Sequence, residues 1–441
     1  MFTIDRERIL TDELLYKMIN KFCIGVKPKL EKYKNYYDGI QKIKEKRYSD
    51  DSKPCNRSTT NFCKNISDSF CGYLASPGCI SYNSNDGIDE VMDILRYNDF
   101  EDEDSSLLLD ALVYGTAAEL MYIDEDAKVR FKLINPMGCF GVFDNSLTND
   151  LLYFVRWYKR DEWTEDGIYN VDVYGDNYVS HYTMSGLNGS LSLNGTEPHY
   201  FGQCPANIFF LPDERSIFDC IIDLQDSYNE ILTSEIDDYS AFVDAFLCLS
   251  GVDAEEDDIQ KMRQNRVLVL PGDSTATWLT KNASDAQTEN MLKRVSESIY
   301  RIASCPDFSS DSFTGGVSSG IALRFRLCGM ENRAAKIEAL MKRALQRRIE
   351  IICGIASLKL GEEVFRDVEI VFKRNIPTDN NDIVNTVNAL KGTVSDETLL
   401  GMIPLVSDVQ AEIRRVQAQK QANIEMYGFG SGGDGDGGDD E

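Results

Sequence analysis

One stretch of the sequence, from Ser216 to Ala245, combines helical periodicity with charge of a single sign. Its apolar residues recur at spacings of four and three, which places them on one stripe of a helix. These residues are Ile217, Ile221, Leu224, Tyr228 and Ile231. At a rise of about 1.5 Å per residue the predicted helix is about 45 Å long, much longer than an average helix. A fold for this chain must therefore accommodate one long rod.

The predicted helix carries eight carboxylates and no Lys or Arg. Four of them are spaced by seven residues and form a nearly straight line along one face: Asp223, Glu230, Asp237 and Asp244. Charge runs usually lie on a solvated face. Like charges three and four residues apart nevertheless repel one another, and this helix has no opposite charges of its own to compensate them. We therefore expect partners elsewhere.

A second predicted helix, from Ile321 to Leu358, is a candidate source of these partners because it holds eight Lys and Arg residues against three Glu. Its apolar residues keep helical spacing along its whole length. The bases that we expect to pair helices, within one subunit or between subunits, are Arg324, Arg326, Arg333 and Arg347.

The net charge of −27 argues against tight binding of a nucleic-acid backbone. The last eight residues hold five acids and no base, so the rest of the chain still carries −22. Sequence-independent affinity for nucleic acid comes from Lys and Arg that neutralise phosphates. This charge does not exclude a chain that surrounds DNA without gripping it. No apolar run approaches the roughly 20 residues that span a bilayer, so no membrane partner is expected.

The order of segments predicts an α+β, helix-rich fold. A helix capped by Thr11 and another from Asp99 to Tyr114 precede a series of short β-branched and aromatic segments between turn clusters. After the acidic helix we expect a compact insert, with a helix at 254–265 and strands at 267–270 and 276–279. A helix at 284–304, the basic helix, an edge strand at 368–372 and three short helical stretches, at 381–391, at 396–403 with Ser395 as cap and at 407–422, complete this part of the prediction. Near the start of the chain a second helix is expected to run through Leu30, Tyr33, Tyr37, Ile40 and Ile43.

The residue types that carry catalysis or bind metals are not arranged for either. Gly315 and Gly320 have the spacing of a phosphate-binding loop, but Ile321 stands at the Lys position, which removes the phosphate contact. The two histidines, His181 and His199, have no Cys or His neighbour at metal-ligand spacing. No catalytic residue, metal ligand or cofactor is therefore predicted.

Seven motifs, in this order, resemble the portal proteins, or head-to-tail connectors, of tailed bacteriophages, in the branch typical of phages of Gram-positive hosts. The resemblance spans nearly the whole chain, and although each motif alone is weak, their collinear order is specific. The motifs are YYDGI from Tyr36, NFCKNISDSFCGYL from Asn61, LQDSYN from Leu224, LCLSG from Leu247, PDFSSDSFTGGVSSGIALRFRL from Pro306, FKRNIPTD from Phe372 and LKGTVSDETLLGMIPLVSD from Leu390.

This resemblance implies the phage portal fold with wing, stem, clip and crown, long stem helices and a small α/β clip. The implied parts are an α+β wing over 1–215, a stem helix over 216–245, the clip over 246–285, a second stem helix over 286–304, a tunnel loop over 305–320, a long wing helix and return strand over 321–379, a crown over 380–427 and a disordered acidic tail over 428–441.

The resemblance also implies a structural role and no enzymatic activity. A homo-oligomeric ring of twelve copies at one capsid vertex conducts double-stranded DNA, without sequence specificity, during packaging and ejection. Its implied partners are the large subunit of the terminase motor, head-completion or adaptor proteins, and the major capsid and scaffolding proteins. Its implied location is the virion, after assembly in the host cytoplasm.

The tunnel loop is the segment that this resemblance places against the passing duplex. Its residues are Asp307, Phe308, Ser309, Ser310, Asp311, Ser312, Phe313, Thr314, Gly315, Gly316, Val317, Ser318, Ser319 and Gly320.

Several alternatives stay open. A line of carboxylates facing the tunnel would give phosphates no place to bind, whereas a line facing outward would meet bases on a neighbouring subunit. In function, the alternatives are another ring-forming structural protein of the virion, and a metal-dependent hydrolase that uses the carboxylates at 255–258.

Overall fold

A computed structural model describes most of the chain and divides it into two compact units, Met1–Lys373 and Arg374–Glu441. The described residues are 2–47, 54–83, 89–161, 163, 167–186, 189–242, 246–250, 275–279, 285–309, 320–360, 368–376, 380–403, 406 and 409–428. The predicted α+β, helix-rich fold is confirmed. The helix predicted at 254–265 and the strand predicted at 267–270 lie outside the described residues.

The chain opens with a strand, β1 (Phe2–Ile4), and two helices, α1 (Asp12–Lys21) and α2 (Lys27–Tyr37), joined by a π-helical turn at Phe22–Val26. Thr11 caps α1 as predicted, since its hydroxyl accepts the N–H of Leu14 at 3.4 Å. The expectation that the second helix continues past Tyr37 is wrong. Gly39 adopts a φ of +80°, which ends the helix, and a separate 3₁₀ turn follows at Lys42–Glu45.

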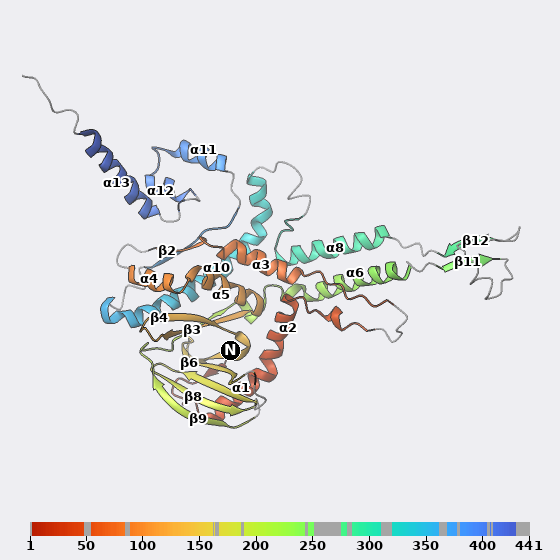
Figure 1. The fold of residues 1–441 in the computed structure, drawn as a ribbon, viewed down its shortest axis with the longest axis horizontal. Coiled ribbons are helices and arrows are strands. Elements are labelled where there is room, and N and C mark those ends of the chain that lie inside the picture. Colours follow the sequence, from red (N-terminus) through yellow and green to blue (C-terminus); the bar gives the residue numbers. More distant parts are fainter. Residues whose placement is uncertain are drawn as a thin grey trace, which may run out of the picture. The chain divides into compact units, whose positions relative to one another are not determined.

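A six-stranded sheet in the order β1-β5-β6-β7-β8-β9 forms one side of the first unit. Its strands after β1 are antiparallel neighbours, and β1 pairs with β5 in parallel. The bounds are β5 (Cys139–Asp144), β6 (Leu151–Lys159), β7 (Ile168–Tyr174), β8 (Tyr178–Ser185) and β9 (Leu191–Pro198). Figure 1 shows this sheet with α1 against it.

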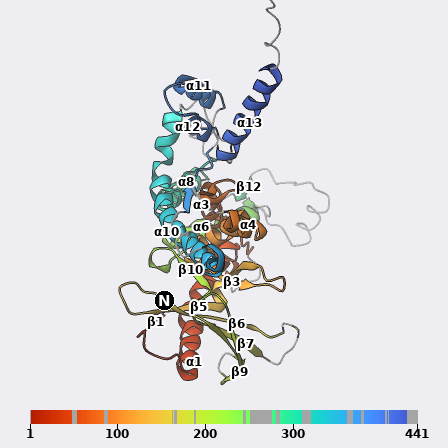
Figure 2. The same cartoon turned by 90° about the vertical axis from the view of Figure 1, so that its left-hand side faces the viewer.

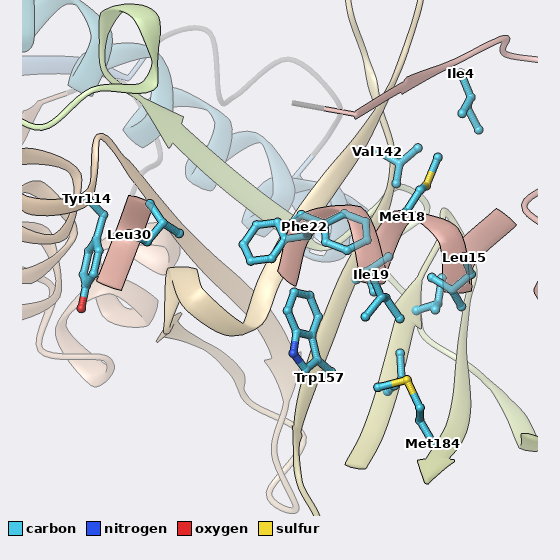
Figure 3. Close-up of a cluster of buried hydrophobic side chains, with 14 of the residues drawn as sticks. Ile4, Leu15, Met18, Ile19, Phe22, Leu30, Tyr114, Val142, Trp157 and Met184 are labelled. Carbon is cyan, nitrogen blue, oxygen red and sulfur yellow. The ribbon is translucent and has the colours of Figure 1, made fainter. Parts of the chain in front are cut away.

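The apolar side of α1 and the π turn form a core with this sheet. Leu15, Ile19 and Phe22 are buried, and Figure 3 shows them pointing toward strands that carry Val142 and Trp157. The ring of Phe22 meets Trp157 edge-on, with centroids 5.1 Å apart. Helical periodicity in the sequence therefore identifies the face of α1 that the sheet covers.

A three-stranded antiparallel sheet in the order β10-β3-β4 lies between the six-stranded sheet and a layer of helices (Figure 1). Its strands are β3 (Thr116–Ile123), β4 (Val129–Ile134) and β10 (Ala206–Phe210). The helices are α3 (Phe62–Ala75), α4 (Asp89–Tyr97), α5 (Phe100–Tyr114) and the long α10 (Gly320–Leu360), which lies beside β10 (Figure 2). A two-stranded sheet pairs β2 (Ile80–Asn83) with β13 (Glu369–Phe372).

The acidic helix is α6 (Ile222–Phe242), and it runs side by side with α8 (Asp285–Ala303), as Figure 1 shows. It starts later than the predicted Ser216. The Ser216 hydroxyl and the Ile217 amide both donate to the carbonyl of Leu112, which fastens this part of the chain to the end of α5. Beyond α6, β11 (Phe246–Ser250) pairs with β12 (Thr275–Leu279).

The second unit contains α11 (Asn380–Leu390), α12 (Asp396–Gly401) and α13 (Val409–Gly428), so the three predicted helical stretches are confirmed. The Ser395 hydroxyl accepts the N–H of Thr398 at 3.3 Å and caps α12 as predicted.

A fully buried ion cluster joins α10 to the three-stranded sheet. Arg348 on α10 donates from Nε to both carboxylate oxygens of Glu119 on β3, at 3.0 Å each, and from Nη1 to Asp104 on α5. The Tyr82 hydroxyl and the Asn207 amide supply further donors to the two carboxylates, each at 2.6 Å. Burial raises the pKa of Asp104, and the neighbouring guanidinium opposes that shift. One cation thus holds two acids from separate elements.

Replacing Arg348 by Met is expected to lower the free energy of unfolding by about 3–5 kcal/mol, because two buried carboxylates lose their counter-charge. Urea unfolding followed by circular dichroism measures this. Arg294→Met, at an exposed position of α8, is the control and is expected to change stability by less than about 0.5 kcal/mol. Equal effects of the two substitutions would contradict a structural role for the cluster.

Candidate functional site at the acidic helix

Arg333 of α10 holds together the chain ends from which α6 and α8 extend. Its Nη1 donates to the carbonyl of Ala303, the last residue of α8, and its Nη2 donates to the carbonyl of Ile217, both at 2.5 Å. Its guanidinium lies over the ring of Phe70, 5.6 Å from the centroid. Burial lowers the pKa of Arg333 from its ordinary value. This candidate residue therefore binds backbone carbonyls at the base of the helix pair and not the acids of α6.

One face of α6 is lined by four buried polar side chains spaced by four residues. They are Gln225, Asn229, Thr233 and Asp237. Each of them bonds to the extended segment 56–62, and the bonds fall on alternate residues of that segment. We call this arrangement the polar ladder.

The upper rungs of the polar ladder pair side-chain amides with backbone. Gln225 accepts the N–H of Phe62 at 3.0 Å and donates to the carbonyl of Thr60 at 2.5 Å. Asn229 accepts the N–H of Thr60 at 3.0 Å and donates to the side-chain oxygen of Gln41 at 2.5 Å. An irregular, part-buried backbone thus finds its hydrogen-bond partners on a helix and not on a neighbouring strand.

The lower rungs end in an ion pair. The Thr233 hydroxyl donates to the carbonyl of Ser58 at 3.3 Å. One oxygen of Asp237 accepts the N–H and the side-chain amide of Asn56, at 2.7 and 2.9 Å, and the other accepts from Lys46 Nζ at 3.2 Å. Asp237 is buried and pairs with a base from another segment, which separates it from the exposed carboxylates that share its seven-residue spacing.

The polar ladder can form because four residues of helix and two residues of extended chain have nearly the same length. Four residues of α-helix rise about 6.0 Å. Two residues of extended chain span about 6.6 Å. Each fourth side chain of α6 therefore lies opposite each second residue of the segment 56–62, over three repeats.

Tyrosines of α2 cover two more acids near the start of the acidic helix. The hydroxyl of Tyr33 donates to Asp219 at 2.8 Å, and that of Tyr36 donates to Asp226 at 2.8 Å. Burial, followed by the bond to the carboxylate, raises the pKa of each tyrosine. The tyrosine partners of these acids come from the N-terminal segment, and Asp219 also pairs with Arg215 at 3.7 Å, so these partners do not come from the basic helix that the sequence suggested.

The remaining members of the predicted acidic line behave differently. Asp223 and Glu230 are exposed, and within the described part of the chain neither carboxylate has a hydrogen-bond or ion-pair partner. Ser227 and Ser234, also exposed, lie between and beyond them on the same side. Asp244 lies outside the described residues. We call this side, with Asp223, Ser227, Glu230 and Ser234, the acidic face of α6.

The other candidate bases of α10 lie at different places along the helix. Arg326 is exposed near the start of the helix, and Arg347 pairs with Glu350 of its own helix at 2.8 Å. The backbone of Arg324 belongs to α10, but its side chain lies outside the described residues.

The predicted tunnel loop is described only at its ends. Asp307 turns the chain after α8 by accepting the N–H and the hydroxyl of Ser309, at 3.0 and 2.6 Å. Phe308 is 47% exposed. Gly320 is the first residue of α10, so the loop joins α8 to α10. Residues 310–319 lie outside the described residues, as do the carboxylates at 255–258.

Both histidines bond to β7 or to the residue that follows it. His181 bonds through Nδ1 to Asp172 at 2.7 Å, and His199 bonds through Nε2 to the carbonyl of Gly175 at 2.8 Å. The described residues contain no group of three or more His, Cys, Asp or Glu side chains placed to hold a metal ion. None of the helices among them has the length and apolarity to cross a membrane.

Comparison with known proteins places the chain among phage proteins. The family described as "Phage portal protein, SPP1 Gp6-like" matches residues 26–426. The portal protein of Bacillus phage SPP1 is 22% identical over 434 residues, covering 93% of this chain and 84% of that protein.

Replacing Asn229 by Leu is expected to leave the Thr60 amide without an acceptor and to lower the free energy of unfolding by about 1–3 kcal/mol. Hydrogen exchange at Thr60 is expected to accelerate on the order of tenfold or more. Ser234→Ala, on the exposed side of α6, is the control. Unchanged protection of Thr60 in the Asn229 variant would rule out the ladder.

Proposed function

The chain belongs to the SPP1 Gp6-like family of phage portal proteins, and we propose on this basis that it forms a ring of twelve copies through which double-stranded DNA passes. Portal function is established by the family, which is a family of structural proteins. The copy number, the path of the DNA and the docking partners are our proposal for this chain. The observation that carries it is the paired rod of α6 and α8, with one exposed face of purely negative charge.

Charge supports passage of DNA without binding. Duplex DNA carries about one negative charge per 1.7 Å of its axis, and a protein holds it by neutralising phosphates. A chain with a net charge of −27 offers few such contacts per subunit. Smooth passage in both packaging and ejection requires this weak hold.

We assign the parts of the portal to the chain by the position of their motifs. Residues 1–215 are the wing, 216–245 and 286–304 the stem helices, 246–285 the clip and 380–427 the crown. The long helix and return strand at 321–379 complete the wing. In this assignment the clip docks the terminase large subunit and later the head-completion or adaptor proteins. The major capsid and scaffolding proteins surround the ring at one vertex of the virion, after assembly in the host cytoplasm.

The loop between α8 and α10 is the proposed contact with passing DNA. Its described end carries an exposed aromatic ring, Phe308, beside the base of the helix pair where Arg333 binds Ala303. Its sequence, rich in Gly and Ser, makes few demands on conformation.

The purified protein is expected to assemble into a ring with a mass close to twelve times 49.8 kDa. Mass photometry measures the mass, and negative-stain images down the axis show the central opening. A monomer, or a small oligomer without an opening, under all assembly conditions would refute the proposal.

Replacing Gly315, Gly316 and Gly320 together by Ala is expected to leave ring assembly intact and to impair DNA packaging, because Ala restricts the backbone of the loop. At Gly320, the first residue of α10, Ala favours the helix, so folding is not at risk. Packaging assays with assembled rings test this. Normal packaging per ring combined with defective assembly would contradict the role of the loop.

A further inference from the structure

The acidic face of α6 is left without a partner by the fold of one subunit. Two other acids of α6 already have partners within the subunit. Asp237 belongs to the polar ladder, and Asp226 accepts a hydrogen bond from Tyr36. Asp223 and Glu230 are exposed, and between them stands only the small side chain of Ser227. This face therefore offers two carboxylates on a surface low enough for another helix to approach closely.

One exposed face of α10 carries the opposite charge. Its exposed residues include Ala335, Lys336, Ala339 and Arg343, which we call the basic face of α10. Within the described stretch 325–343 no exposed residue is acidic. The two glutamates of this stretch turn to other partners, since Glu331 accepts from Tyr73 and Glu338 pairs with Lys342.

The two faces match in spacing as well as in sign. Asp223 and Glu230 are seven residues apart, and so are Lys336 and Arg343. Seven residues correspond to about 10.5 Å of helix, and after two turns both side chains of each pair return to the same side. The alanines of one face and the serine between the acids of the other leave room for the two long cationic side chains to reach across.

The two faces also begin at the same place in the subunit. Arg333 binds the carbonyl of Ile217, so the middle of α10 lies at the base from which α6 extends. Lys336 follows Arg333 by one turn, and Asp223 follows Ile217 by less than two turns. In a closed ring, copies are related by rotation about one axis, and surfaces that meet must lie at equal height along it.

We propose that the acidic face of α6 in one copy packs against the basic face of α10 in the next copy around the ring. This inference rests on the proposed ring and names its contact: a head-to-tail interface in which each subunit offers both signs. It assigns Asp223 and Glu230 to the neighbouring subunit, not to the tunnel. A second copy is the favoured occupant because it supplies a face with matching sign, spacing and height.

The test uses two full-length charge-reversal variants. One carries Asp223→Lys with Glu230→Lys, and the other carries Lys336→Glu with Arg343→Glu. Each alone brings like charges together at every interface, and the concentration needed for half-assembly is expected to rise at least on the order of tenfold. In an equimolar mixture every interface can again join opposite charges if the two variants alternate. Mixing is therefore expected to restore rings.

Mass photometry at about 0.15 M salt measures assembly, and native mass spectrometry is expected to find equal numbers of the two variants in each ring. The control, Glu125→Lys with Asp126→Lys in the exposed β3–β4 turn, makes the same change of charge elsewhere and is expected to assemble like the wild type. Normal assembly of the acid-reversed variant, or no rings in the mixture, would overturn the proposal.

Two further results distinguish this interface from a DNA-binding surface and from a loss of folding. If the variant Lys336→Glu with Arg343→Glu binds a DNA duplex more weakly than the wild type but assembles normally, the basic face of α10 is a DNA-binding surface and the proposal fails. If a reversal lowers the melting temperature, the neutral pairs Asp223→Asn with Glu230→Gln and Lys336→Gln with Arg343→Gln replace it. These are expected to remove most of the salt dependence of assembly, and an unchanged salt dependence overturns the proposal. A wild-type chain that forms no ring refutes the proposed function itself.

Discussion

The hydrogen bonds between one face of α6 and the extended segment 56–62 determine which side of the acidic helix faces outward. They satisfy backbone groups that no strand serves, and they fix the rotation of the helix about its own axis. That rotation buries Asp237 against Lys46 and leaves Asp223 and Glu230 exposed. The position of the exposed charges on α6 is thus a consequence of a hydrogen-bond network most of whose members are uncharged.

The same relation between burial and pairing holds in the interior of the first unit. Charges that fold inward are paired across elements distant in sequence, as Arg348 is with Asp104 and Glu119. On two helices, exposed charges are segregated by sign, with acids on the acidic face of α6 and bases on the basic face of α10. This segregation does not stabilise an isolated subunit, because the acids of α6 and the bases of α10 do not pair with each other within it. In a head-to-tail ring each face meets its complement, and the repulsion within a single helix becomes attraction between copies.

Local patterns in the sequence were sufficient to predict the helices with strong periodicity and clear caps. The hydroxyls of Thr11 and Ser395 cap helices as expected, and α5, α8 and α10 lie close to their predicted bounds. The polar ladder was missed because its partners are more than 160 residues apart in the chain. Gln225, Asn229 and Thr233 at intervals of four gave the only local signal, a polar stripe beside an apolar one. Spacing by seven groups Asp237 with Asp223 and Glu230 although only Asp237 is buried, because spacing alone carries no information about which face another segment covers.

The most direct test of the interface between copies is a cryo-electron microscopy reconstruction of the assembled protein at a resolution that places side chains. We predict a closed ring in which Asp223 and Glu230 of each copy lie within ion-pair distance of Lys336 and Arg343 of the next. A ring in which these carboxylates line the central opening, with the basic face of α10 turned away from the neighbouring subunit, would contradict it.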